Sequence, residues 1–174
     1  MRHQSLAVSL LGWIGGYLTP FLLSAGETQS AGLLTYIALL TAGLLLVVAK
    51  KEDWVILSPL TFVATHSVYL IWRIGLFTPE ETGMALTFAT IYWGLFHGLD
   101  LWCWLKKVKS HTAIRLIVSF FNALFFVSIV CDLMDLAAKD WTAAVLLLIG
   151  MIYLASFLVA VRLKPRPKPV RGQL

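Results

Sequence analysis

Six apolar stretches, each close to the length of a membrane-spanning helix, dominate this sequence. A helix needs about 20 mainly apolar residues to cross the hydrocarbon core of a bilayer, which is about 30 Å thick. Because lipid offers the backbone no hydrogen-bond partners, such segments fold as helices. The predicted spans are Ser5–Leu23, Gly32–Ala49, Trp54–Phe77, Gly83–Leu105, Ile114–Leu133 and Trp141–Val161.

The composition excludes a soluble domain. Of 174 residues, 59% are hydrophobic and 13% are charged, whereas a soluble domain is roughly half apolar and one quarter charged. The net charge of +5 does not indicate a nucleic-acid partner, because the Lys and Arg residues fall in short clusters between apolar stretches and in the tail. We therefore predict an all-α polytopic membrane helix bundle of six transmembrane helices, with one domain over residues 1–161 and a basic, Pro-rich cytoplasmic tail over residues 162–174.

The basic residues also predict an orientation. If the N-terminus is cytoplasmic, all 14 Lys and Arg residues lie on that side except Lys139 and Arg73. We therefore predict that both termini are cytoplasmic. Acidic residues collect on the opposite side, at Glu27, Glu80, Glu81, Asp132, Asp135 and Asp140. Interfacial tryptophans are expected on the inner side at Trp54, Trp102 and Trp104, and on the outer side at Trp72 and Trp141.

The first span carries signals that compete. A basic start and the small residues 24–26 resemble a secretory signal peptide, but the apolar run is long and is interrupted late by Gly15, Gly16 and Pro20, so we expect it to be retained as a span. Pro20 removes one backbone hydrogen bond and predicts a kink or break. Thr19 could satisfy a freed carbonyl, and a kink that serves packing is favoured over a discontinuous helix that binds a ligand.

Two pairs of small residues predict close helix packing. Gly12 and Gly16 are four residues apart in the first span, and Gly94 and Gly98 are four apart in the fourth. Such pairs let helix backbones approach closely, which is a main source of attraction between helices in lipid. We expect these glycines to pack within the subunit or between subunits.

The first span also carries the most specific motif. Residues 15–26, GGYLTPFLLSAG, resemble the Gly-Gly-(Phe/Tyr)-Leu-Thr-Pro-Leu-Leu-Leu-Ser-x-Gly element of a family of uncharacterised bacterial membrane proteins, domain of unknown function 2339. The similarity continues through residues 36–40, through Lys50-Lys51 with Trp54, and through residues 122–126. Because members of that family are expected to be much longer, the resemblance implies one module or a shortened member. It also implies the bacterial inner membrane, and it implies little about chemistry.

Ionisable and polar residues at membrane depth gather on the third and fourth spans. They form a candidate polar intramembrane site, since an ionisable side chain in hydrocarbon costs a few kcal/mol and usually has a partner or a purpose. On the third span, Ser58, Thr65, Tyr69 and Arg73 share one helical face. At 1.5 Å per residue, the two span histidines would differ in depth by only about 6 Å. The candidates are His66, Tyr69, Arg73, His97 and Asp100.

Each of these residues also has a structural explanation. Arg73 can pair with Glu80 or Glu81 near the outer interface, and Asp100 can snorkel or pair with Lys106 and Lys107 near the inner one. His97 can form an orienting hydrogen bond with Asp100. For His66, the deepest of the set, a hydrogen bond between helices and a role in protonation or ligand binding both remain open.

No cofactor or metal is expected, because no local spacing demands metal or haem ligands around His66 and His97. Cys103 and Cys131 lie near opposite ends of successive spans, so no disulfide is expected. The chain has no Ser-His-Asp, Glu-x-x-His or glycine-rich phosphate motif. We therefore do not expect an enzyme, and an intramembrane enzyme with His97 and Asp100 as acid and base is the least favoured reading.

The expected partners are membrane lipids and other membrane proteins. The alternating basic and proline residues of the tail favour an extended strap that binds anionic headgroups, through Lys164, Arg166, Lys168 and Arg171. We expect a structural or accessory subunit that forms homo- or hetero-oligomers. The alternative is a small transporter or channel that uses a polar site between the third and fourth spans.

Overall fold

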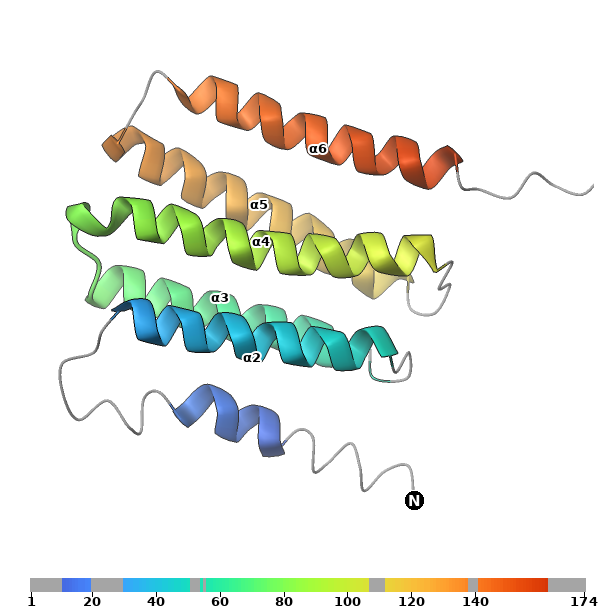
Figure 1. Ribbon diagram of the computed structural model, residues 1–174, viewed down its shortest axis with the longest axis horizontal. Coiled ribbons are helices and arrows are strands. Elements are labelled where there is room, and N and C mark those ends of the chain that lie inside the picture. The colour runs from blue at the N-terminus through green and yellow to red at the C-terminus, as the bar shows by residue number, and fades with distance from the viewer. Residues whose placement is uncertain are drawn as a thin grey trace, which may run out of the picture.

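The computed structural model describes residues 11–19, 30–50, 54, 56–106, 112–137 and 141–162. Within these residues every regular element is a helix, which confirms the all-α fold class. A helix over residues 11–19 comes first (Figure 1). The others are α2 (Ser30–Lys50), α3 (Leu57–Gly75), the short 3-10 helix η2 (Pro79–Glu81), α4 (Thr82–Leu105), α5 (Thr112–Ala137) and α6 (Thr142–Arg162).

The observed helices follow the predicted spans closely. The main difference is at α5, which was expected to end at Leu133 and continues to Ala137. Leu133 is fully buried and Met134 is 8% exposed, so the extra turn still packs against the bundle. Among the described residues, three helical segments are long and apolar enough to cross a membrane: α2, residues Thr112–Asp135 of α5 and residues Thr142–Val159 of α6.

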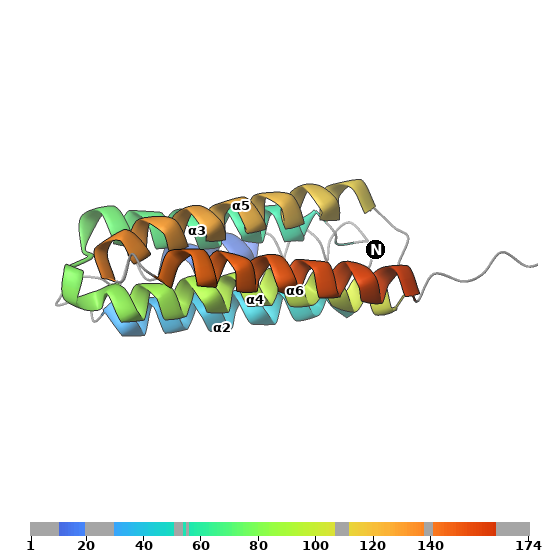
Figure 2. The ribbon, with the colours of Figure 1, turned by 90° about the horizontal axis from the view of Figure 1, so that it is seen from above.

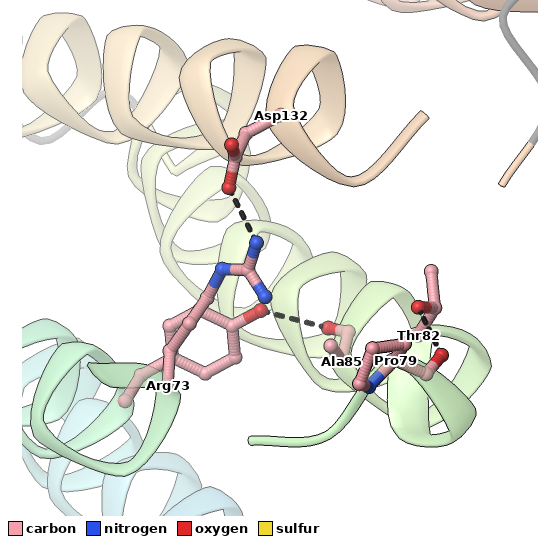
Figure 3. Close-up of polar contacts among 6 residues, drawn as sticks. Arg73, Pro79, Thr82, Ala85 and Asp132 are labelled. Carbon is pink, nitrogen blue, oxygen red and sulfur yellow. Dashed lines mark hydrogen bonds and ion pairs between the residues drawn. The ribbon is translucent and has the colours of Figure 1, made fainter. Parts of the chain in front are cut away.

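A capping box makes the turn between α3 and α4. The carboxylate of Glu81 accepts a hydrogen bond from the Thr78 amide at 3.0 Å, and Thr78 caps η2 in return. The Thr82 hydroxyl then donates to the Pro79 carbonyl at 2.6 Å (Figure 3). These bonds satisfy backbone groups at the helix start, so the chain reverses within a few residues.

The labelled helices alternate in direction and form two layers. Figure 1 shows them lying roughly side by side, and Figure 2 shows α3 and α5 in one layer and α2, α4 and α6 in the other. Because direction alternates, basic residues at the ends of α2, α4 and α6 and at the start of α5 meet at one end of the bundle: Lys50, Lys106, Arg115 and Arg162. The acidic residues Glu80, Glu81, Asp132 and Asp135 lie toward the other end.

The core between the layers is rich in aromatic side chains. Its fully buried members include Tyr69, Trp72 and Tyr92, which are each no more than 1% exposed. A smaller cluster of Leu45, Phe96 and Val118 lies toward the basic end. Outside the core, α6 exposes several large apolar side chains, among them Leu147 and Phe157. An apolar outer surface around a packed interior is the arrangement that lipid favours.

Trp72 was predicted at the outer interface, and this prediction is wrong. Its side chain is 1% exposed and its ring contacts Phe77 edge-on at 5.8 Å between centroids. Trp102, Trp104 and Trp141 are exposed, as interfacial residues should be. Trp72 lies in the last turn of α3, but its ring faces the protein interior.

Candidate functional site

The polar face of α3 points into the bundle. Ser58, Thr61, Thr65 and Tyr69 are at most 3% exposed, and the side chain of Arg73 is 11% exposed. The polar stripe of α3 therefore faces the protein interior. The environment of each polar side chain therefore decides what the stripe can do.

Three hydroxyl groups form a closed triangle near the middle of this face. The Tyr17 hydroxyl lies 3.1 Å from Thr41 Oγ1 and 2.8 Å from Thr65 Oγ1, and the two threonine oxygens are 2.8 Å apart. Three hydroxyl protons are enough for three hydrogen bonds, so each oxygen can donate once and accept once. The triangle joins the helix over residues 11–19, α2 and α3, and its members are buried.

Tyrosines of α3 and α4 bond backbone carbonyls of neighbouring helices. The Tyr69 hydroxyl donates to the Ala85 carbonyl of α4 at 3.0 Å (Figure 3). The Tyr92 hydroxyl donates to the Leu34 carbonyl of α2 at 2.9 Å. Both phenols therefore tie helices together.

His66 lies in an aromatic cage. Its Nδ1 donates to the Phe62 carbonyl, one turn earlier in α3, at 2.9 Å. Its ring contacts Phe62, Phe96 and Phe125 with centroid distances of 4.1, 5.7 and 4.3 Å. The hydrogen bond of Nδ1 thus stays within α3, and aromatic rings make the contacts to α4 and α5.

His97 faces α6 and does not bond Asp100. Its Nε2 lies 3.0 Å from the Ser156 hydroxyl, which donates its own proton to the Ile152 carbonyl at 2.9 Å. Ser156 must therefore accept from Nε2, which leaves Nδ1 as an acceptor, buried and without a partner among the described residues. The predicted orienting bond between His97 and Asp100 is wrong, because the ring turns toward Ser156.

Trp93 holds this contact between α4 and α6 together. Its ring stacks on His97 at a centroid distance of 5.2 Å and on Phe126 of α5 at 4.8 Å. Its indole nitrogen donates to the Tyr153 hydroxyl at 2.9 Å, and its carbonyl accepts from Asn122 at 3.1 Å. Three helices are joined through this one residue.

Asp100 lies toward the basic end, beside α5. Its carboxylate is hydrogen-bonded to Ser119, and Arg115 is near enough to stabilise its charge. Lys106, one of the two expected partners, lies over the Trp102 ring at 5.0 Å instead, and Lys107 lies outside the described residues. The carboxylate of Asp100 therefore faces α5 and not Lys106.

The two span histidines have different neighbours. His66 contacts phenylalanines of α3, α4 and α5, whereas His97 contacts Trp93, Tyr153 and Ser156. In the part of the chain that the structure describes, no group of three or more His, Cys, Asp or Glu residues could hold a metal ion. Cys103 and Cys131 are free thiols.

Arg73 pairs with an acid that the sequence did not indicate. Its Nη2 forms an ion pair with Asp132 of α5 (Figure 3), and its guanidinium lies 4.2 Å from the centroid of Phe77. The prediction of Glu80 or Glu81 as the partner is wrong, because Glu81 already caps η2. The pair links α3 to α5 at the acidic end.

The glycines divide into two groups. A methyl group on Gly16 would lie 3.1 Å from a Leu40 carbon of α2, so the helix over residues 11–19 approaches α2 closely there. Gly12, Gly94 and Gly98 have nothing within 4 Å at the same position. The prediction of packing within the subunit is therefore confirmed for Gly16 only.

The Gly16 carbonyl accepts a hydrogen bond from the Tyr36 hydroxyl of α2 at 3.0 Å. Residue 20 is a proline and has no amide proton to give to the carbonyl four residues earlier. Thr19 bonds the Gly15 carbonyl at 2.6 Å, so two side chains serve the carbonyls of this last turn. Pro20 itself and the tail residues Lys164, Arg166, Lys168 and Arg171 lie outside the described residues.

Sequence reasoning missed several residues that hold the bundle together. Tyr17, Thr41 and Tyr36 bond across helices, as do Tyr92 and Trp93. The available signal was a lone hydroxyl within an otherwise apolar stretch, which usually needs a partner in lipid. A lone hydroxyl in an apolar stretch indicates that the residue forms a hydrogen bond, but it does not indicate which residue is the partner.

The family comparison agrees with the helical, apolar architecture. A family model described as "Predicted membrane protein (DUF2339)" matches residues 1–170. No curated protein and no solved structure matches the chain. Two of the segments that carry the resemblance meet in the structure, where Tyr36 and Leu40 contact Gly16. The chain belongs to the DUF2339 family of membrane proteins.

Proposed function

We propose that this protein is a structural or accessory subunit of a membrane assembly, without catalytic activity, in the bacterial inner membrane. It spans the bilayer six times, with both termini in the cytoplasm. The basic end of the bundle supports this orientation, because Lys and Arg residues are retained on the cytoplasmic side. The tail residues Lys164, Arg166, Lys168 and Arg171 bind anionic headgroups there.

The lengths of α3 and α4 support their role as spans. They contain 19 and 24 residues, which at 1.5 Å per residue gives about 28 and 36 Å, close to the hydrocarbon thickness. Several of their polar side chains face the interior, and others bond their own helix. Thr87 and Thr90, which are exposed, donate to the Gly83 and Leu86 carbonyls at 2.8 Å.

One observation carries the functional proposal: several of the polar groups at membrane depth join helices to one another. The hydroxyl triangle, the Tyr69 bond to Ala85 and the Arg73 ion pair all cross between helices. A transporter site would instead converge on a ligand-sized cavity. The transporter alternative is therefore less well supported than a packing module.

The outward face of α4 is the proposed contact with another subunit. Gly94 and Gly98 are exposed, and both have open space where a side chain would stand. Because the hydroxyls of Thr87 and Thr90 bond their own helix, this face of α4 presents only small side chains at these positions and no free polar group from them. Small residues four apart favour close helix approach in lipid.

Native mass spectrometry of the intact protein in gentle detergent tests this proposal. We expect an assembly larger than the monomer, which is lost in the double variant Gly94→Ile, Gly98→Ile. Gly43→Ile is the matched control, because Gly43 is also exposed with nothing within 4 Å, and it should keep the assembly. A strict monomer before any substitution contradicts the proposal.

A further inference from the structure

A small recess opens toward the basic end of the bundle, between α3, α4 and α5. It lies apart from the hydroxyl triangle and from the Arg73–Asp132 ion pair. Its polar lining comes from one residue of α3, one of α4 and two of α5. The recess is lined by Ser58, Phe96, Leu99, Asp100, Arg115, Val118 and Ser119.

The recess carries one charge of each sign. Asp100 is hydrogen-bonded to Ser119, but its Oδ1 is buried and has no hydrogen-bond partner among the described residues. Arg115 brings a guanidinium to the same recess. A simple anion would be repelled by Asp100 and a simple cation by Arg115, so a ligand with both charges fits best.

The size of the recess limits which part of a ligand can enter. Its volume is about 10 Å³, which is close to the minimum for one water-sized group. A primary ammonium is of that size, whereas a trimethylammonium is several times larger. The rest of the ligand, including its negative group, must therefore remain outside, near Arg115.

The position of the recess matches the level of lipid headgroups. Asp100 lies five residues before the end of α4 at Leu105, which is about 8 Å along the helix axis. Arg115 lies in the first turn of α5. Trp102 and Trp104 are exposed on the same final turns of α4, as tryptophans at a membrane interface are.

We propose that this recess binds the headgroup of a phospholipid with a primary ammonium, of the phosphatidylethanolamine class. The ammonium enters the recess and donates a hydrogen bond to Asp100 Oδ1. The phosphate stays at the mouth and accepts from Arg115, with the acyl chains along α3 and α5 in the bilayer. The assignment to the cytoplasmic leaflet rests on the orientation proposed above. The assignment of the headgroup class does not depend on that orientation.

Native mass spectrometry with added lipids tests the proposal on the full chain. Phosphatidylethanolamine, its N-monomethyl and N,N-dimethyl forms, phosphatidylcholine and phosphatidylglycerol are each added at the same ratio. We expect retention to fall with each added methyl group and to be about tenfold lower for phosphatidylcholine, as the loss of one charge-assisted hydrogen bond predicts. Equal retention of the first and last of this methylation series overturns the proposal without any variant.

Two variants separate the contributions of the two charges. Asp100→Asn should remove the preference for phosphatidylethanolamine over phosphatidylcholine, whereas Arg115→Gln should weaken retention of all the lipids. Asp135→Asn, which changes an exposed acid toward the opposite end, should change neither. An Asp100→Asn protein that keeps the preference contradicts the assignment of Asp100.

A soluble competitor distinguishes the lipid from its headgroup alone. Free phosphoethanolamine carries both charges but has no acyl chains, so it should displace the lipid only at far higher concentration than a short-chain phosphatidylethanolamine. Equal displacement by both would make the ligand a soluble molecule and overturn the lipid assignment. The oligomeric state of the protein is read from the same spectra. An intact assembly without lipid preference refutes only the lipid-binding inference. A monomer that still prefers phosphatidylethanolamine refutes only the proposed function.

Discussion

At the scale of single residues, the Gly16 carbonyl, four positions before Pro20 in the sequence, receives its hydrogen bond from a neighbouring helix. A proline withdraws the amide that would have bonded the Gly16 carbonyl, and an unpaired carbonyl in lipid has no water to turn to. Tyr36 of α2 supplies a hydroxyl at 3.0 Å. The missing side chain of Gly16 lets α2 come close enough, because even one carbon would lie 3.1 Å from Leu40.

Tyr36→Phe should therefore destabilise the protein, by about 1 kcal/mol, the usual size of a hydrogen bond between membrane helices. The cost should shrink in a Pro20→Ala background, where residue 20 regains an amide that can bond the Gly16 carbonyl. Reversible unfolding of all four members of this double-mutant cycle measures the difference. An equal cost of Tyr36→Phe in both backgrounds contradicts this role of Tyr36.

At the scale of helices, the sequence predicted where each helix begins and ends better than it predicted which helices pack together. The stretch Gly32–Ala49 predicted α2, which runs from Ser30 to Lys50, because length and apolarity alone decide where a span can lie. Periodicity also predicted that the polar face of α3 is buried. Neither signal says which helix faces it, so Arg73 was assigned to nearby acids and not to Asp132, 59 residues away.

The hydroxyl triangle was beyond sequence reasoning for the same reason. Thr65 stood on a predicted polar face, but Tyr17 and Thr41 come from two other helices. Their meeting depends on the rotation and axial shift of three helices at once. The histidines illustrate the converse, since similar predicted depth did not bring His66 and His97 to common partners.

The two residues of the ion pair between α3 and α5 should differ in how much stability the protein loses when each is replaced. The Arg73 side chain is 11% exposed and that of Asp132 is 62% exposed. Asp132→Asn leaves a mostly buried cation without its counter-ion, whereas Arg73→Gln leaves an acid that water can solvate. We expect Asp132→Asn to cost about 1–2 kcal/mol and to be the more damaging change.

Unfolding of the two single variants in the same detergent measures this order. Asp135→Asn is the control, because Asp135 is exposed and lies less than one turn further along α5, and it should leave stability nearly unchanged. A larger loss in Arg73→Gln than in Asp132→Asn would mean that the guanidinium is stabilised mainly by Phe77 and not by the carboxylate.

At the scale of the whole molecule, the alternating helix directions place basic residues at one end of the bundle and acidic residues at the other. Four basic residues gather at one end and four acidic residues at the other, although they come from different helices and turns. Basic residues resist translocation much more strongly than acidic ones. The bundle therefore has one favoured orientation, with the start of α5 and the end of α6 toward the cytoplasm.

Accessibility of single cysteines tests this orientation. In a chain with Cys103 and Cys131 replaced by Ala, we expect Glu80→Cys to react with a membrane-impermeant maleimide in intact spheroplasts. Arg162→Cys should react only after the membrane is permeabilised. The reverse pattern would invert the proposed topology, and reaction of both sites in sealed spheroplasts would contradict the three crossings, α4, α5 and α6, that separate them.

The hydroxyl triangle has a consequence for biogenesis. Its members come from the first three helices in chain order, so every group it needs is synthesised before α4. These helices can bond the three hydroxyls of the triangle to one another while the later spans are still being synthesised. The first three helices can thus begin to assemble before α4, which then accepts a hydrogen bond from Tyr69 at Ala85 and donates one from Tyr92 to Leu34.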